Sequence, residues 1–339
     1  MMQLSFWFNR SENRISGWLA FIRRKPMAKW TKRIFIAILA LVLLSGVFYY
    51  WFPGLILESV KHGLRFWAGL ERREVKVDDH HWVYLEGGKG ETILFVHGFG
   101  AYKDLWGTFL PAFSGSYRLV VPDLPGFGEN PGLASDTFDI PSQVTRLSQF
   151  VETIGLENFH MVGISMGGYI SAYYASDHPD RVKSLLLMDA AGVDSRIPSY
   201  IWRRYQKDGN VPLIYRTPEQ FDDLMGVLFY RPPWVPGRFK EYIAQKGAVN
   251  HDFHEKILRE MVDGGMNLLE NRLPKIRAKT LVIWGANDRV LHVSSVEAFQ
   301  KGLRNCRTVI LEQCGHIPYL EKPEETKRAY KDFLGNLER

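Results

Sequence analysis

Ser165 stands in the sequence GISMGG at positions 163 to 168, which fits the pattern G-x-S-x-G. An apolar run at 159–162 precedes the motif and a helix-like stretch at 169–175 follows it, so a strand, a tight turn and a helix are predicted. A serine hydroxyl is a poor nucleophile at neutral pH, and such a turn lifts it to where a base can reach it. The glycines leave room where a Cβ would clash with neighbouring backbone. Because the pattern also fits an ordinary turn, the chemistry needs support from other residues.

A base and an acid for this serine follow two later predicted strands. The run 281–284 leads to Asp288, and the run 308–311 leads to His316. Catalytic groups in open parallel sheets collect beyond the carboxyl ends of the strands, so these side chains are expected to meet Ser165. The order along the chain is then nucleophile, acid and base. We predict that Ser165 attacks an acyl carbonyl, that His316 takes its proton and that Asp288 holds the imidazolium.

A glycine-flanked turn, HGFG at 97–100, follows the predicted strand 93–96 and can aim backbone N–H groups at a developing oxyanion. We predict that the N–H groups of Phe99 and Met166 form this oxyanion hole. His97 is interpreted as a structural residue that bonds backbone around the site. Asp123, in the sequence VPDLPG, is predicted to order its own turn.

Alternatives remain for the acid and the base. Asp189 ends the strand before the helical insertion and could supply the acid, whereas Asp288 could be a turn residue. Asp288 is favoured because its loop, like that of His316, follows a late strand of the sheet. His316 could be a capping or core histidine, although its place between Gly315 and Ile317 just past a strand favours a base.

The segments that must position these residues alternate between short apolar runs and helical stretches, which is typical of a mostly parallel sheet covered on both faces. Eight strands are predicted, at 75–77, 82–85, 93–96, 119–121, 160–162, 184–188, 281–284 and 308–311. The alternation fails between the two halves of this core, which are 74–192 and 275–339. The intervening segment, 193–274, is rich in aromatic residues and proline and is predicted to form a helical lid, with helices at 198–208, 217–229 and 237–262.

The predicted lid carries more large apolar side chains than a small insertion needs for its own packing. An acyl-chain site usually has such a lining with few polar groups. The candidate substrate-binding residues are Trp202, Phe221, Leu224, Phe229, Tyr230 and Trp234, together with Tyr205. Many large apolar side chains in an insertion of this size are simply core.

The N-terminal region differs in character from the rest of the chain. Residues 34–52 carry no charge and are long enough to cross a hydrocarbon core of about 30 Å, so we predict a transmembrane anchor. A cleaved signal peptide is the alternative, but bulky aromatic residues stand where a cleavage site needs small ones. Residues 1–33 carry eight basic side chains and one acidic side chain, which leaves the remainder at −1 in a chain of net charge +6. The basic tail predicts a cytoplasmic N-terminus and an extracytoplasmic, or periplasmic, catalytic domain.

The segment 53–73 links this anchor to the core and is predicted to contain an amphipathic helix. Its apolar stripe comprises Ile56, Val60, Leu64 and Trp67, with charged residues elsewhere. Such a helix can lie along a bilayer or pack on the catalytic body. Met27 begins a second plausible N-terminus, so residues 1–26 form either a short tail or an extension of the natural chain.

Composition argues against other classes of function. The basic character belongs to the tail, so it gives no support for nucleic-acid binding by the globular part. Cys306 and Cys314 flank one predicted strand, about 26 Å apart, which is too far for a disulfide. His80 and His81 have no spaced partners and do not form a convincing metal site. We expect no metal and no cofactor, and oligomeric state is left open.

These motifs together resemble the α/β-hydrolase-fold serine lipases, and within them the membrane-anchored monoacylglycerol lipases and related bacterial lipases. The resemblance runs from about residue 73 to the C-terminus and includes HGFGAYKDLW at 97–106, VGISMGG at 162–168, VPLIYRTPEQFDDL at 211–224, IWGANDRVL at 283–291 and NCRTVILEQCGHIPYLEKPEE at 305–325. It implies a lipid-ester substrate, Phe99 and Met166 as oxyanion residues, and a lid over the site. Mammalian members of this group face the cytosol, whereas here the basic cluster precedes the span, so sidedness is not carried over.

Three functions compete at this point. The first is a membrane-anchored carboxylester hydrolase that acts on monoacylglycerol-like or medium-chain esters. The second is a carbon-carbon bond hydrolase of ring-cleavage products, which would share a similar serine turn but needs no membrane anchor. The third is a hydrolase-fold binding protein without activity, which an intact Ser-His-Asp set disfavours. Acyl-chain preference and physiological substrate are not determined by these residues.

Overall fold

The computed structural model describes residues 29 to 209 and 211 to 337. The chain divides into two units, residues 1–56 and residues 57–339. In the first unit, helix α2 (Lys29–Trp51) is long and apolar enough to cross a membrane, and none of its residues is buried. This helix confirms the predicted apolar span. The remainder of the predicted basic tail, residues 1–28, lies outside the described residues.

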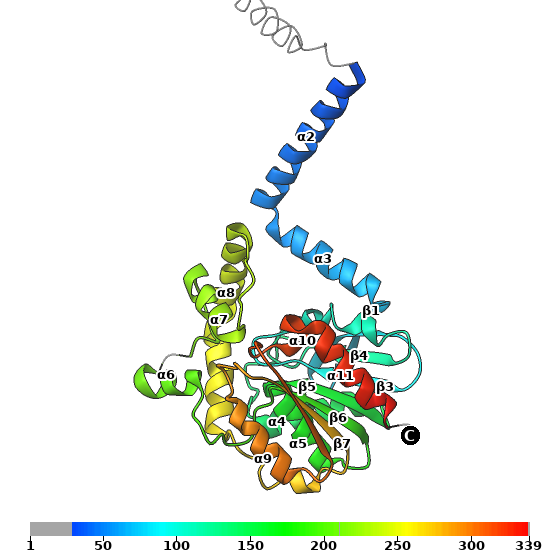
Figure 1. Cartoon of the computed structure of the whole chain (residues 1–339), viewed down its shortest axis with the longest axis vertical. Helices are drawn as coiled ribbons and strands as arrows, with labels where there is room; N and C mark the ends of the chain where they lie inside the picture. Colours follow the sequence, from blue (N-terminus) through cyan, green and yellow to red (C-terminus); the bar gives the residue numbers. More distant parts are fainter. Residues whose placement is uncertain (1–28, 210, 338–339) are drawn as a thin grey trace, which may run out of the picture. The chain divides into compact units, whose positions relative to one another are not determined.

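The second unit is built on one eight-stranded sheet, as predicted (Figure 1). The strand order is β1-β2-β4-β3-β5-β6-β7-β8, with β1 and β2 antiparallel to their neighbours and the others parallel. The strands are β1 (Leu70–Val77), β2 (His80–Gly87), β3 (Thr92–Val96), β4 (Arg118–Pro122), β5 (Phe159–Ile164), β6 (Val182–Met188), β7 (Lys279–Gly285) and β8 (Cys306–Leu311).

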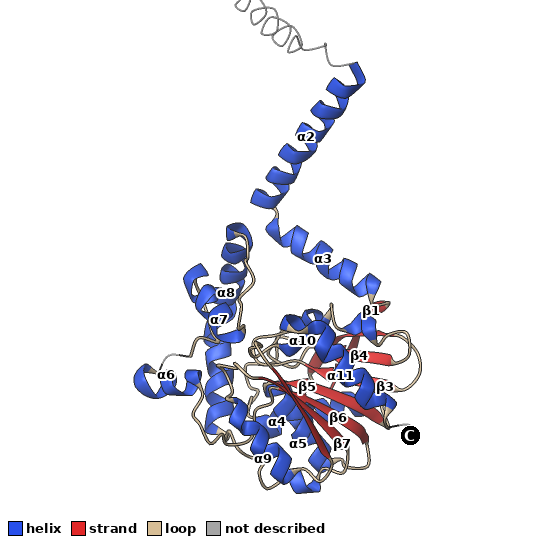
Figure 2. Ribbon diagram, in the orientation of Figure 1, coloured by secondary structure: helices blue, strands red, loops and turns tan. Residues whose placement is uncertain are grey.

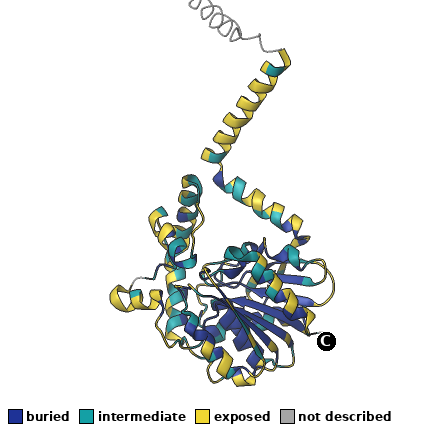
Figure 3. Ribbon diagram, in the orientation of Figure 1, coloured by how far each residue is buried: buried dark blue, intermediate teal, exposed yellow. Residues whose placement is uncertain are grey.

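Helices cover both faces of this sheet (Figure 2). The helices of the core are α4 (Ile140–Thr153), α5 (Met166–Asp177), α9 (Val296–Gly302), α10 (Pro318–Glu321) and α11 (Pro323–Gly335). Successive side chains of a strand point to opposite faces, so β3 sends Leu94 and Val96 into the core beside α4 and α5 and sends Ile93 and Phe95 into the core beside α11. The central strands β3 and β5 are therefore largely apolar and buried on both faces (Figure 3).

The predicted lid forms three helices, which group beside one edge of the body in Figure 1: α6 (Tyr200–Asp208), α7 (Pro218–Leu228) and α8 (Gly237–Asp263). The sequence-based bounds of these helices are confirmed to within two residues. Side-chain hydroxyl groups cap the N-termini of α6 and α7. Ser199 accepts a hydrogen bond from Trp202 N at 3.1 Å, and Thr217 accepts one from Gln220 N at 3.3 Å. A small core of their own holds Ile201, Phe221, Leu224, Val227 and Val290.

Helix α3 (Pro53–Trp67) contains the predicted juxtamembrane helix, and its stretch from Leu57 onward belongs to the second unit. The residues of its predicted apolar stripe differ in burial. Leu64 is half-buried, whereas Val60 and Trp67 are exposed; Arg65, expected on the polar side, is instead buried. The physical reason is an ion pair between Arg65 and Asp104, which offsets the cost of removing the guanidinium from water.

Candidate active site

Ser165 occupies a strained turn between β5 and α5. Its φ is +55° and its ψ is −123°, a conformation that non-glycine residues adopt rarely. A Cβ on Gly163 would lie 2.3 Å from the Gly167 carbonyl oxygen, and a Cβ on Gly167 would lie 2.3 Å from the His97 carbonyl oxygen. The predicted need for glycine on both sides of the serine is therefore confirmed by close backbone approach. The peptide of Ser165 is held by hydrogen bonds to Met188 and Ala191, both 3.0–3.1 Å long.

His316 and Asp288 meet beyond the ends of β8 and β7. The His316 Nδ1 lies 2.8 Å from the Asp288 Oδ2, and both side chains are buried. The other carboxylate oxygen, Oδ1, accepts hydrogen bonds from the N–H groups of Val290 and Leu291 at 2.7 and 3.1 Å. A carboxylate can only accept, so the imidazole carries its proton on Nδ1 and leaves the lone pair of Nε2 able to accept a proton. Within the described residues Ser165 Oγ forms no hydrogen bond with His316, a contact that commonly tightens when substrate binds.

Asp189, the alternative acid, lies next to this pair without replacing Asp288. One oxygen each of Asp189 and Asp288 and one ring nitrogen of His316 lie within 4.8 Å of one another. Asp189 Oδ1 accepts from the Gly285 N–H at 2.9 Å, and its Oδ2 has no hydrogen-bond partner among the described residues. Burial, followed by the charge of Asp288, raises the pKa of Asp189 well above its usual range. The raised pKa favours the neutral form of Asp189.

His97 orders the predicted oxyanion turn, in agreement with its interpretation as a structural residue. Its Nε2 accepts from the Leu124 N–H at 3.0 Å, so the proton of the neutral ring is on Nδ1, which donates to the Gly98 carbonyl oxygen at 2.8 Å. Burial lowers the pKa of His97 and keeps the ring neutral. In a trans peptide the C=O and the following N–H point in opposite directions, so this bond aims the Phe99 N–H away from His97.

The two predicted oxyanion residues each follow a residue of the serine turn or its contact: Met166 follows Ser165, and Phe99 follows Gly98. Gly98, which precedes Phe99, is so close that a Cβ there would lie 3.2 Å from the Ser165 Cβ. Met166 is the first residue of α5, where N–H groups have no partner within the helix and the helix dipole favours negative charge. Phe99 and Met166 also line the same cavity as Ser165. The arrangement can stabilise an anion formed next to the serine.

A cavity of about 820 Å³ opens in front of Ser165, between the core and the lid. Its volume falls in the range that holds a small organic ligand. The apolar residues of the lining include Leu213, Ile214, Leu258, Met261, Val262 and Met266. Its polar residues include Asp194, Gln220, His251, Glu255 and Arg259. The lining therefore offers both apolar and polar groups to a ligand.

The structure separates the candidate substrate-binding residues of the lid. Trp202 lines the cavity, and so does Tyr205. The other five candidates do not line it. Phe221 and Leu224 pack in the small core of the lid, because an insertion of three helices needs its own buried contacts. Phe229 is buried with its backbone against Gly315, Tyr230 donates its N–H to Glu321, and Trp234 is 84% exposed.

The sequence did not predict the buried polar network around Lys103, which adjoins the predicted oxyanion turn. This lysine is 1% exposed, and its Nζ donates to Asp123 Oδ2 at 2.7 Å and to Glu129 Oε1 at 2.5 Å. Asp123 also accepts from the Glu129 N–H at 2.8 Å, which confirms the prediction that it orders its own turn. The sequence around Lys103 offers one signal for this network, the two charged residues KD at 103–104 within an apolar stretch. The partners of Lys103 could not be predicted because they lie 20 or more residues away along the chain.

Comparison with known proteins agrees with the fold. A family model described as the α/β-hydrolase fold matches residues 91–323. The chain is 32% identical to a monoacylglycerol lipase of Homo sapiens over 281 residues, which cover 79% of this chain and 83% of the relative. It is 35% identical to lipase 1 of Psychrobacter immobilis over 260 residues, which cover 76% and 81%. The crystal structure of a membrane phospholipase A, described as a bacterial virulence factor, superposes with a TM-score of 0.82 at 37% identity and covers 91% of this chain and 99% of that one.

Proposed function

The chain belongs to the α/β-hydrolase fold family, and on that premise we propose that it is a serine carboxylester hydrolase, a lipase or esterase, that cleaves lipid esters. One observation carries the proposal. A buried aspartate holds Nδ1 of a histidine at 2.8 Å, beyond the same edge of the sheet where a strained turn presents a serine to an 820 Å³ cavity. The names of the relatives support hydrolysis of acyl esters.

The proposed reaction runs through an acyl-enzyme. Ser165 Oγ attacks the ester carbonyl carbon while His316 Nε2 takes the hydroxyl proton, and Asp288 stabilises the imidazolium through Nδ1–H. The N–H groups of Phe99 and Met166 stabilise the oxyanion, each worth about 10²-fold or more in rate. His316 then gives its proton to the departing alcohol. Water, activated by the same histidine, attacks the acyl-enzyme and releases the carboxylic acid and free Ser165.

We further propose a monoacylglycerol-like or medium-chain ester as the substrate. The apolar lining residues, among them Leu258, Met261 and Met266, can contact an acyl chain. The polar lining residues can bind an alcohol or head group. Trp202 and Tyr205, whose rings lie 5.6 Å apart, belong to the lid side of the lining. The family resemblance to monoacylglycerol lipases supports the same class of substrate.

The place of action proposed is a membrane surface. Helix α2 has the length and composition of an anchor, and the first positively charged residues before the apolar run are Lys32 and Arg33. We propose a cytoplasmic N-terminus and an extracytoplasmic catalytic domain. Protease treatment of intact spheroplasts of a bacterial expression host tests this orientation. Digestion of the catalytic domain only after the inner membrane is lysed would contradict it.

A panel of p-nitrophenyl esters of graded chain length tests the function. The purified full chain is expected to hydrolyse them, and Ser165→Ala is expected to abolish turnover. A fluorophosphonate label should map to Ser165 in the wild-type chain. Turnover of a ring-cleavage product without ester turnover would favour the carbon-carbon hydrolase. Neither turnover nor labelling would favour a binding protein.

A further inference from the structure

The stretch of α3 from Leu57 to Trp67 packs on the loop that carries the predicted oxyanion residue Phe99. We call residues 97–107 the oxyanion loop. Three contacts at helical spacing join the two segments. Lys61 Nζ lies 4.8 Å from the ring centroid of Tyr102, and Arg65 binds Asp104. Leu64 lies so close to Gly107 that a Cβ there would be 3.0 Å from the Leu64 Cδ1. One face of the helix therefore covers the far end of this loop.

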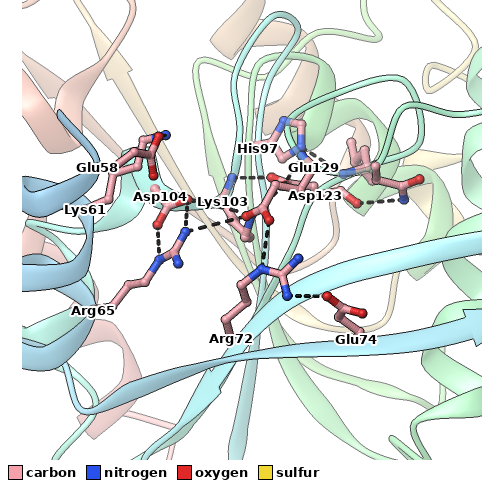
Figure 4. A network of polar contacts seen from close by, with 12 residues as sticks. Glu58, Lys61, Arg65, Arg72, Glu74, His97, Lys103, Asp104, Asp123 and Glu129 are labelled. Carbon is pink, nitrogen blue, oxygen red and sulfur yellow. Dashed lines mark hydrogen bonds and ion pairs between the residues drawn. The ribbon is translucent and has the colours of Figure 1, made fainter. Parts of the chain in front are cut away.

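The Arg65 contact is bidentate and buried. Nε donates to Asp104 Oδ1 at 2.5 Å, and Nη2 donates to Asp104 Oδ2 at 2.9 Å (Figure 4). The two side chains are only 9% and 5% exposed. Charge-assisted pairs of this geometry fix orientation as well as contribute energy. The hydrogen bond to Asp104 raises the pKa of Arg65, which stays charged.

From Asp104 the polar contacts continue to the oxyanion turn. The adjacent residue, Lys103, donates to Asp123 twice, from its backbone N and from Nζ, both at 2.7 Å. Next to Asp123, the Leu124 N–H donates to His97, which donates to the Gly98 carbonyl oxygen. Figure 4 draws this network together, from the α3 side chains to His97. The oxyanion loop is thus held at its first residues by His97 and at its far end by Arg65.

We propose that Arg65 is a positioning residue for the proposed ester hydrolysis: it holds the oxyanion loop in the conformation that aims the Phe99 N–H at the reacting carbonyl. The juxtamembrane helix then helps to position the oxyanion loop, in addition to linking the catalytic domain to the anchor. Elsewhere on this helix Val60 is 53% exposed and Phe66 is 88% exposed. This inference rests on the proposed function, because it needs an oxyanion to form at Ser165.

Kinetics of the full chain in detergent micelles test the proposal. Arg65→Met is expected to lower kcat for p-nitrophenyl butyrate by about tenfold or more, because small misplacements of a catalytic group are costly, and to leave KM within about twofold. Butylboronic acid forms a tetrahedral adduct with a catalytic serine, so its inhibition constant should rise by a factor similar to the loss in kcat. Arg65→Lys keeps the positive charge but cannot reproduce the two-pronged geometry of the guanidinium. It should therefore recover part of the lost kcat and part of the lost inhibition by butylboronic acid.

Matched variants separate positioning from stability. Arg73→Met removes an exposed arginine whose hydrogen bond goes to Glu71, and it should leave kcat and boronic acid inhibition unchanged. Asp104→Asn, which keeps size and shape, serves if Arg65→Met does not fold, as judged by its melting temperature. Folded Arg65→Met or Asp104→Asn with wild-type kcat and inhibition constant would overturn the inference. Absence of turnover and labelling in the wild-type chain would overturn the proposed function itself.

Discussion

The His316 imidazole and the Asp288 carboxylate form a buried hydrogen bond of 2.8 Å, although 28 residues separate them along the chain. The bond fixes which ring nitrogen carries the proton, and so decides which nitrogen is available to a nucleophile. Strands β7 and β8 bring the two residues together because they are parallel neighbours in the sheet.

The two neighbouring aspartates should differ sharply in their effect on activity. Asp288→Asn places an amide against His316, favours the wrong tautomer and is expected to lower kcat by about 10⁴-fold. Asp189→Asn should retain most of the activity, because burial raises the pKa of Asp189 and an amide resembles the neutral acid. Steady-state hydrolysis of a soluble ester at pH 7.5 measures both. The assignment would be reversed if Asp189→Asn were the inactive variant.

Two substitutions of His97 should separate its two hydrogen bonds. Asn places a donor near the position of Nδ1 and can keep the bond to the Gly98 carbonyl, whereas Gln places an acceptor near Nε2 and can keep the bond from Leu124. If the Gly98 bond aims the Phe99 N–H, His97→Asn should have a kcat at least several-fold above that of His97→Gln. Equal kcat values for the two folded variants would show that this bond does not matter for catalysis.

Stability should fall as the pH drops below the pKa of an unfolded histidine, about 6.5. Burial lowers the pKa of His97, so below pH 6.5 the unfolded chain binds a proton that the folded chain does not. The free energy of unfolding then falls by up to about 1.4 kcal/mol per pH unit for this one group. Urea titrations in detergent at pH 7.5 and 5.5 measure the loss. His97→Asn should show a smaller loss than the wild-type chain, although His254, whose pKa burial also lowers, keeps part of it.

The glycines of the serine turn should not tolerate even one methyl group. In Gly167→Ala the Cβ would lie 2.3 Å from the carbonyl oxygens of Val96 and His97, so the turn must shift. We expect a loss of about 1–3 kcal/mol in unfolding free energy, together with loss of activity. Gly226→Ala in α7 is the control, because among the described residues nothing apart from its own helix backbone and chain neighbours lies within 4 Å of its Cβ position. Alanine is favoured over glycine in a helix by about 1 kcal/mol, so this control should be neutral or stabilising.

Trp202 and Trp234 provide a matched test of the proposed acyl site. Trp202 lines the cavity, whereas Trp234 is 84% exposed and does not. Trp202→Ala should raise KM more for octanoate than for acetate p-nitrophenyl esters, because a longer chain reaches more of the apolar lining. Trp234→Ala should leave the ratio of the two KM values unchanged in detergent. An equal effect of both variants would place the acyl chain elsewhere.

Local sequence determined much of this protein. The glycines around Ser165, the alternation of apolar runs and the apolar span were sufficient to predict the eight strands, the lid helices and the membrane-length helix, because these depend on neighbours within a few residues. The order of Ser165, Asp288 and His316 placed all three beyond the ends of parallel strands. Such features need no knowledge of distant contacts.

Tertiary structure decided what depends on distant partners. Between Asp189 and Asp288, both at strand ends, only the fold shows which carboxylate reaches His316 and which is buried without a charge partner. Phe221 and Leu224 have the same apolar character as Trp202, yet they fill the core of the lid, while Trp202 faces the cavity. Arg65 reads as a solvent-exposed residue in the sequence, and it is buried because Asp104, 39 residues away, supplies the opposite charge. Burial and charge pairing depend on which residues are neighbours in space. The order of residues along the chain does not by itself specify those neighbours.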